Sequence, residues 1–298
     1  MAAVRPPHEL TPSGPHDALL PWRQGLAYGA LALPLAFVSL PLYVSLPHHY
    51  ATQAGVPLTV LGSTLLGLRA LDALIDPWLG RRADHRLRQG APSAWRAAAL
   101  MALVLAMSFA ALWQPPAGEW PRAWAWLVAS LGVCTLAFSA LSLLHQGWGT
   151  RWGGSVAWRT RVTAWREGAT LLGVLVASGL PWLLGTGGTS FALAGALALG
   201  LWGLWTLTAS APPLAPPACV AARPAAGRAP PSPWRQADFR HLLAVFLING
   251  TASAIPATLL PFFASDRLMA TSWQPAVLLA YFAAGAVGLP AWAALAGR

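Results

Sequence analysis

Long apolar runs alternate with short polar segments along almost the whole chain. A helix needs about 20 apolar residues to cross the hydrocarbon core of a bilayer. Prolines inside such runs do not exclude helices, because kinks are tolerated in membranes. The pattern therefore predicts an all-α polytopic membrane protein with eight spans, near residues 24–46, 57–79, 95–113, 121–145, 163–184, 189–209, 239–263 and 273–296.

The composition supports this interpretation. The chain has 298 residues, of which 56% are hydrophobic and 9% are charged, whereas soluble domains average roughly 25% charged residues. Many of the 17 tryptophans lie near the ends of apolar runs, where the headgroup zone favours amphipathic rings. Cys134 and Cys219 indicate neither a disulfide framework nor a cysteine-rich metal site.

The arginines predict the orientation of the chain. Lysine is absent, and most arginines lie in alternate loops and near the two chain ends, with only Arg122 and Arg267 in the opposite loops. The positive-inside rule then places both termini in the cytoplasm. The net charge of +10 does not indicate nucleic-acid binding, because the arginines are spread among loops and build no basic domain.

One proline-rich segment divides the chain. Residues 210–237 contain so many prolines that a packed element is disfavoured. Six spans precede this linker and two follow it, and transporters of the major facilitator type begin with six spans and a long cytoplasmic linker. We therefore expect a cytoplasmic segment at 1–23, a six-helix bundle at 24–209 and the first two helices of a shortened second bundle at 238–298.

A charged stripe interrupts the second apolar run. Arg69, Asp72 and Asp76 have the spacing i, i+3, i+7 and share one helical face. Each charge near the membrane centre costs roughly 2.5–3.5 kcal/mol on insertion scales, so these side chains should face the protein interior or a watery cavity. The two carboxylates repel each other, which favours a bound proton or a hard cation such as sodium.

The same stripe also has a structural interpretation. Arg69 would neutralise Asp72, and Asp76, next to Pro77, would cap the loop end of the helix. The spacing alone leaves the cation site and this structural role open.

The motif R-x-x-D-A-x-x-D-P-x-x-G at 69–80 resembles the second helix of the glycoside–pentoside–hexuronide:cation symporter family. This family is the melibiose-permease branch of the major facilitator superfamily, and the resemblance runs from about residue 24 to the end of the chain. It implies that Asp72 and Asp76 help to form a sodium or proton site. It also implies a major facilitator fold, C-terminally truncated, in the inner (plasma) membrane of a bacterium.

The stretch G-R-R-A-D-H-R that follows resembles the cytoplasmic loop signature of the superfamily. This resemblance implies gating contacts by a loop that contains Gly80, Asp84 and Arg86. The simpler interpretation of its arginines is positive-inside anchoring of the membrane span.

Two further stretches, at 145–149 and 159–168, resemble the fourth-to-fifth helix region of the same family. They imply that Trp148 and Arg166 contact a sugar, and the weaker first-helix resemblance adds Tyr28 to the substrate-binding residues. The simpler interpretations are an interfacial anchor for Trp148 and a positive-inside charge for Arg166.

The chain also departs from this family. Residues 30–46 carry no charge, so the sugar-specific carboxylate of the first helix has no counterpart. The carboxylate that completes the sodium site on the fourth helix falls near Leu144, beside His145. These departures favour protons over sodium, with His145 and Arg69 as candidate proton-linked residues. A plain interfacial role for His145 is the alternative.

These observations predict cation-coupled symport of a small solute by alternating access. A sugar or glycoside is the default substrate, and a lysolipid or other amphipathic solute is the alternative. A second hypothesis is a non-transporting remnant or a membrane partner protein, because a complete transporter needs two halves around its site.

An enzyme is not expected, since the chain has no H-E-x-x-H, G-x-S-x-G or phosphate-loop motif. No cofactor is expected other than the coupling proton or sodium ion, and no resident metal. The expected partners are the lipid bilayer and a small-molecule substrate, with the chain acting as a monomer and binding no nucleic acid.

Overall fold

The structure is a computed structural model that describes residues 20–152, 156–210 and 235–262, with short pieces between 267 and 288. All regular secondary structure in these ranges is helical. The chain separates into two compact units, Met1–Ala215 and Pro216–Arg298, which are described separately.

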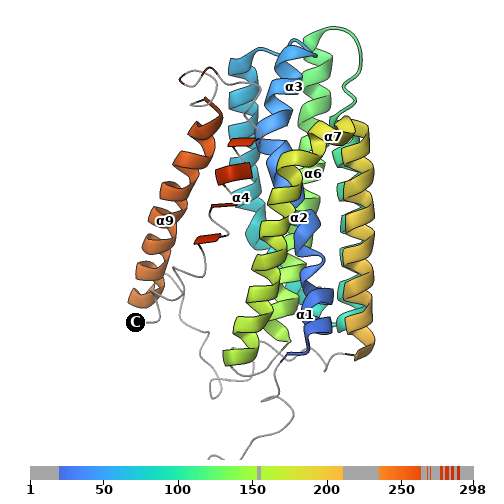
Figure 1. The fold of residues 1–298 in the computed structure, drawn as a ribbon, viewed down its shortest axis with the longest axis vertical. Helices are drawn as coiled ribbons and strands as arrows, with labels where there is room; N and C mark the ends of the chain where they lie inside the picture. The colour runs from blue at the N-terminus through green and yellow to red at the C-terminus, as the bar shows by residue number, and fades with distance from the viewer. Residues whose placement is uncertain are drawn as a thin grey trace, which may run out of the picture. The chain divides into compact units, whose positions relative to one another are not determined.

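The first apolar run forms a helical stretch that is broken into four pieces (Figure 1). They are α1 (Trp22–Gly29), α2 (Ala32–Leu40), the π-helix η1 (Pro41–Ser45) and α3 (Leu46–Thr52). Proline removes a helical hydrogen bond and clashes with the preceding turn, and π-turns commonly accompany helix kinks. Pro34 in α2 and Pro41 at the start of η1 account for the breaks, and the stretch extends the predicted span at 24–46 at both ends.

The remaining helices of the first unit are long. They are α4 (Leu58–Arg88), α5 (Ala91–Leu112), α6 (Trp120–Arg151) and α7 (Val156–Ser210). Within α7, Gly185 has φ 65° and ψ −176°, a backbone conformation that glycine adopts without steric penalty. This kink divides α7 into a first arm, 156–184, and a second arm, 186–210, which correspond to two separately predicted spans.

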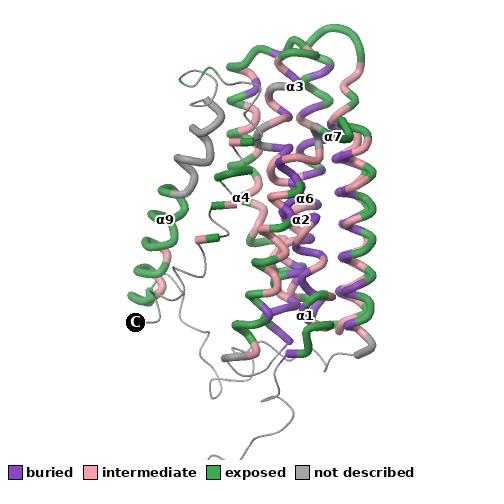
Figure 2. Tube along the Cα trace, in the orientation of Figure 1, coloured by how far each residue is buried: buried purple, intermediate pink, exposed green. Residues whose placement is uncertain are grey.

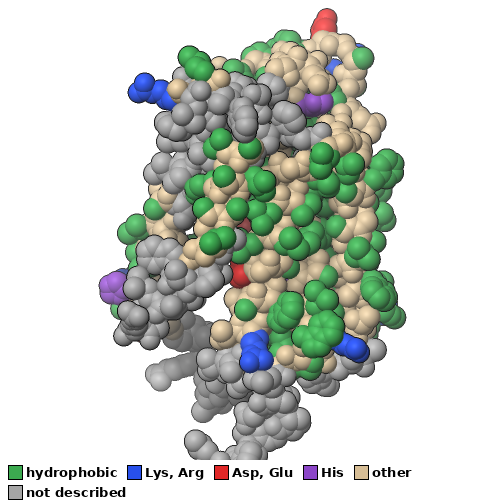
Figure 3. All heavy atoms as spheres, in the orientation of Figure 1, with side chains coloured by type: hydrophobic (Ala, Val, Ile, Leu, Met, Phe, Trp, Pro, Cys, Tyr) green, Lys and Arg blue, Asp and Glu red, His purple; other side chains and the backbone are tan. Residues whose placement is uncertain are grey.

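Among the described residues, four helices are long and apolar enough to cross a membrane, namely Leu58–Arg88, Ala91–Leu112, Trp120–Arg151 and Leu183–Thr208. On the face of the first unit drawn in Figure 3, hydrophobic side chains cover the middle of the helices, and arginines lie toward their ends. This arrangement confirms the predicted all-α polytopic fold class.

The core of the first unit lies where α2, α5, α6 and α7 meet (Figure 2). Small residues let these helices approach closely, as in many membrane bundles. A Cβ atom on Gly203 of α7 would lie 2.6 Å from the Ala27 carbonyl oxygen, and one on Gly200 would lie 2.8 Å from the Leu31 Cα. The second arm of α7 therefore packs directly against the backbone of α1 and of the link to α2.

Helix α4 is the most exposed of the long helices of the first unit. Only 6% of its most apolar window is buried, compared with 44% for α6. It packs mainly against α6 and much less against α5, and leucines such as Leu66 and Leu74 are largely exposed. One side of α4 is therefore available to lipid or another helix, while the side toward α6 carries its acidic residues.

In the second unit, the structure describes α9 (Ala237–Phe262), which matches the span predicted at 239–263. Most of the predicted span at 273–296 lies outside the described residues, as do Cys219 and most of the linker.

Candidate functional site

The two aspartates of the charged stripe lie on the part of α4 that faces α6. Both are half-buried, and the Ser139 hydroxyl on α6 donates a hydrogen bond of 2.8 Å to Asp72 Oδ1. Ser139 is also close to the Asp76 carboxyl group. The structure thus brings two carboxylates and one hydroxyl together between two helices.

Asp76 contributes an unpartnered oxygen to this acidic cluster. Its Oδ1 atom is buried and has no hydrogen-bond partner among the described residues. A buried acceptor without a partner is destabilising, so the site gains from a ligand such as a proton or a cation. Hard cations prefer oxygen ligands of the kind that this cluster offers.

The structural interpretation of Asp76 as a cap at the loop end is wrong. Helix α4 continues past Pro77 to Arg88, so Asp76 lies in the helix interior. Arg69 is exposed, one turn before Asp72.

Among the described residues, no three histidine, cysteine, aspartate or glutamate side chains gather as metal ligands.

A second cluster joins α1 to α6. The Tyr28 hydroxyl donates to the His145 carbonyl oxygen at 3.0 Å, and His145 Nε2 lies 2.9 Å from the Tyr28 carbonyl oxygen. Because a carbonyl can only accept, this bond places the imidazole proton on Nε2. The two rings stack with centroids 4.3 Å apart, and both residues are buried. The interpretation of His145 as a plain interfacial residue is therefore wrong.

Arg166 from the first arm of α7 completes this aromatic cluster. Its guanidinium group interacts with the Tyr28 hydroxyl and forms an ion pair of 2.6 Å with Glu167. Trp152 lies tilted against Tyr28 with ring centroids 5.6 Å apart. Glu167 and Trp152 were not predicted as site residues, although both lie within a few residues of predicted ones.

Trp148 is buried in α6. Its indole Nε1 has no hydrogen-bond partner among the described residues, which is uncommon for a buried donor. Contact between Trp148 and a substrate stays a prediction.

The acidic and aromatic clusters occupy different positions on α6. Ser139 and His145 are six residues apart, which corresponds to roughly 9 Å along a helix, and six steps of about 100° place them on different faces. The structure therefore brings the predicted cation residues Asp72 and Asp76 together in one cluster. It brings Tyr28, His145 and Arg166 together in a second, separate cluster.

The prediction that Gly80, Asp84 and Arg86 lie in a loop is wrong, because these residues are helical. Gly80, Asp84 and Arg86 lie in the last turns of α4, and only residues 89 and 90 connect α4 to α5. The helix continues because this stretch contains no glycine or proline between Arg81 and Gln89 to interrupt it.

Asp84 has a partner that the sequence did not indicate. It forms an ion pair of 2.8 Å with Arg151 at the end of α6. Arg151 has a side-chain exposure of 5%, compared with 50% for Asp84. The pair ties the ends of α4 and α6 together.

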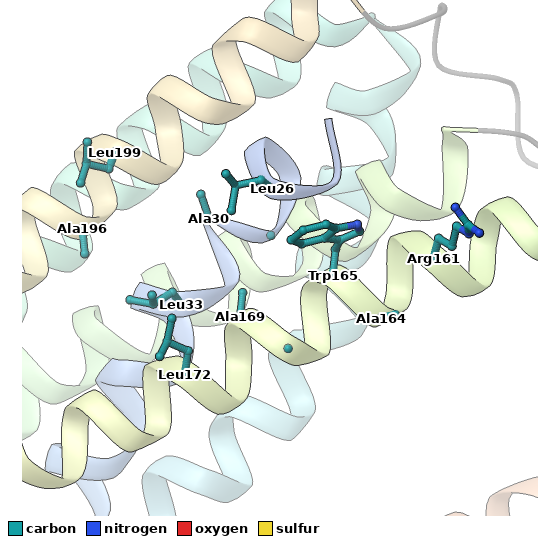
Figure 4. Close-up of a pocket in the computed structure, with 12 residues that line it drawn as sticks. Leu26, Ala30, Leu33, Arg161, Ala164, Trp165, Ala169, Leu172, Ala196 and Leu199 are labelled. Carbon is teal, nitrogen blue, oxygen red and sulfur yellow. The ribbon is translucent and has the colours of Figure 1, made fainter. Parts of the chain in front are cut away.

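A groove of about 700 Å³ lies between α1, α2 and the two arms of α7 (Figure 4). Its lining is apolar apart from Arg161 at one end, and the Trp165 ring lies toward α1. None of the predicted site residues lines this groove. A side chain in place of Gly25 would overlap the Trp165 indole, so glycine allows the ring to pack on α1.

The fold and the clusters define a multi-pass membrane protein whose polar groups lie between its helices. A family model for MFS/sugar transport proteins matches residues 26–298. The chain therefore belongs to the major facilitator superfamily, and this membership places it among secondary transporters rather than enzymes. Comparison with curated proteins and with solved structures finds no match.

Proposed function

We propose that this protein couples the transport of a small solute to the movement of a cation, with a proton as the first choice. Asp72 and Asp76 form the coupling site. The observation that carries the proposal is the acidic cluster, in which Ser139 binds one carboxylate and the other keeps a buried oxygen without a partner.

The composition of the cluster favours a proton over sodium. It offers two carboxylates and one hydroxyl from α4 and α6, and His145 binds the backbone of α1 instead of joining it. Two neighbouring carboxylates repel each other while both are ionised, and one proton relieves this repulsion without further ligands.

The solute would bind near the aromatic cluster. Tyr28, Trp148 and Arg166 combine aromatic surfaces with hydrogen-bond donors, the mixture that orients polar solutes in apolar pockets. A sugar or glycoside suits these groups, and the family description names sugar transport. During alternating access, the Asp84–Arg151 pair would hold the ends of α4 and α6 together so that they move as one body.

The test is uptake into proteoliposomes with an imposed pH gradient or an imposed sodium gradient, using a panel of radiolabelled glycosides. We expect accumulation that follows the pH gradient in the wild type and is lost in Asp76→Asn. Asp238→Asn, on an exposed position of α9, is the matched control and should retain coupling. Accumulation that ignores both gradients and persists in Asp76→Asn would rule out the coupling role.

A further inference from the structure

A second groove lies between the arginine-rich ends of α4, α5 and α6. It measures about 740 Å³, and none of the acidic or aromatic cluster residues lines it. Its charged lining residues are Arg82, Arg86 and Arg96, and its apolar wall includes Leu79, Leu100 and Met101. The positive-inside rule assigns this end to the cytoplasm.

The three arginines of this basic groove have no acidic partner among the described residues. Asp84, the acidic residue nearest to them in sequence, pairs with Arg151 instead. Arg82 lies over the Trp78 ring at 4.0 Å from its centroid, a contact that leaves its charge uncompensated. The three arginines are exposed, and an anion bound between them would relieve the repulsion among their like charges.

The start of α5 adds to this positive potential. The helix begins at Ala91 with no acidic residue in its first turn and no side-chain cap. The N-cap residue is Gly90, and the hydroxyl of Ser93, a groove residue in the first turn, donates to Gln89 Oε1 at 2.8 Å. The N-terminus of a helix carries a partial positive charge and attracts phosphate groups. It therefore acts together with the three arginines.

The groove is long as well as basic. Its lining residues on α5 run from Ser93 to Met101. These eight steps correspond to roughly 12 Å of helix, which is most of the depth of one leaflet, because the whole hydrocarbon core is about 30 Å thick. The groove thus begins among positive charges and ends on apolar side chains within one leaflet.

We propose that the basic groove binds an anionic phospholipid of the cytoplasmic leaflet. The phosphate lies against the three arginines, whose planar groups form paired hydrogen bonds with phosphate oxygens. One acyl chain follows the wall formed by Leu79, Leu100 and Met101. A soluble phosphate would leave this wall uncovered, and a zwitterionic lipid would bring its own cation to the arginines. Basic pockets between membrane helices on this side are known to suit anionic headgroups.

The first test uses the purified 298-residue chain after delipidation. Phosphatidylglycerol or phosphatidylcholine with identical acyl chains is added, and bound lipid is counted by native mass spectrometry. We expect phosphatidylglycerol to bind about tenfold more tightly than phosphatidylcholine, because each arginine near the surface contributes a several-fold attraction. The triple variant Arg82→Gln/Arg86→Gln/Arg96→Gln should lose this preference. Equal retention of both lipids by the wild type would overturn the proposal.

The matched control removes the same charge outside the groove. Arg81→Gln/Arg88→Gln/Arg159→Gln changes three exposed arginines that do not line it. This variant should keep most of the preference for phosphatidylglycerol. If both triple variants lose the preference equally, general surface charge explains the binding, and the groove is not the site.

A third variant tests the acyl chain without changing the charge. Ala97→Phe introduces a large ring into the groove lining and should weaken phosphatidylglycerol binding, whereas Leu103→Phe at an exposed position of α5 should not. Far-UV circular dichroism checks that each variant is folded. If glycerol 1-phosphate displaces phosphatidylglycerol completely and Ala97→Phe has no effect, the groove is a soluble-anion site and the lipid proposal fails.

Discussion

The hydroxyl group of Ser139 on α6 donates a hydrogen bond of 2.8 Å to the carboxylate of Asp72 on α4. This contact links two helices through a carboxylate, which is the kind of group that a coupling cation would bind. It also fixes the orientation of one carboxylate while the buried oxygen of Asp76 stays unpartnered. Ser139 is therefore a positioning residue for the proposed cation site.

Ser139→Ala should weaken the response of uptake to the cation gradient without abolishing it. A hydrogen bond to a charged group contributes about 1.5–3 kcal/mol, and the partial exposure of Asp72 places the effect at the lower end, roughly a tenfold change in apparent cation affinity. The measurement is initial uptake as a function of external pH. Ser142→Ala, one turn further along α6, is the control. Identical pH profiles for both variants and the wild type would contradict a positioning role.

Exchange of either member of the Asp84–Arg151 pair should reduce stability by unequal amounts. Asp84→Asn leaves a guanidinium group that is 5% exposed without its counter-charge, whereas Arg151→Gln leaves a carboxylate that is 50% exposed to solvent. Because an uncompensated buried charge is more costly, Asp84→Asn should be the more destabilising, by about 1–3 kcal/mol.

Thermal unfolding in detergent measures both variants of this pair and the double variant. The double variant should be less destabilised than the sum of the two single variants, because neither remaining side chain is left as an unpaired charge. Additive losses, or a larger loss for Arg151→Gln, would show that the ion pair does not stabilise the ends of α4 and α6.

The apolar runs predicted the helices well, because the length and hydropathy of a span are local properties of the sequence. The kink at Gly185 and the continuation of α4 past Asp84 were harder to predict from the sequence. Glycine is common in this chain, so composition alone does not show which glycine adopts a positive φ. The resemblance of residues 80–86 to a loop signature gives no information about how far the helix extends in this chain.

The contacts within the clusters could not be predicted for a different reason. Ser139 lies 67 positions from Asp72, and His145 lies 117 positions from Tyr28. The i, i+3, i+7 pattern places Arg69, Asp72 and Asp76 on one face of α4, but Arg69 is exposed, and the pattern does not identify the residue on α6 that meets the two aspartates. Such pairings depend on how the helices pack, which no local pattern encodes.

Gly149→Ala should disturb the aromatic cluster strongly. A Cβ atom at this position would overlap the Tyr28 hydroxyl and would lie 2.7 Å from Cζ of the same ring. Because Gly149 and Tyr28 are both buried, the substitution should destabilise the protein by about 1–3 kcal/mol through overpacking. Thermal unfolding measures the loss, with the exposed Gly168→Ala as the control.

Tyr28→Phe distinguishes overpacking from other effects of Gly149→Ala. Alone, it removes the hydrogen bond to the His145 carbonyl and the contact of the hydroxyl with Arg166, and it should cost about 1–3 kcal/mol. Combined with Gly149→Ala, it removes the hydroxyl that the new methyl group meets, so the double variant should be more stable than additivity predicts. Strictly additive losses would show that the Tyr28 hydroxyl does not limit the residue at position 149.

Trp95→Phe should loosen the second arm of α7 from α5. The indole Nε1 of Trp95 donates to the Leu201 carbonyl oxygen at 2.9 Å, and the Trp95 ring packs edge-on against Trp205. Phenylalanine keeps most of the ring contact but lacks the donor, so the expected loss is about 0.5–1.5 kcal/mol in thermal unfolding. Trp202→Phe is the control, since Trp202 is 67% exposed and lies on the same arm. A larger loss of stability for Trp95→Phe would assign the effect to the hydrogen bond between α5 and α7. An equal loss of stability in the two variants would mean that replacing any tryptophan near the lipid has this effect, and it would contradict a specific role for the hydrogen bond.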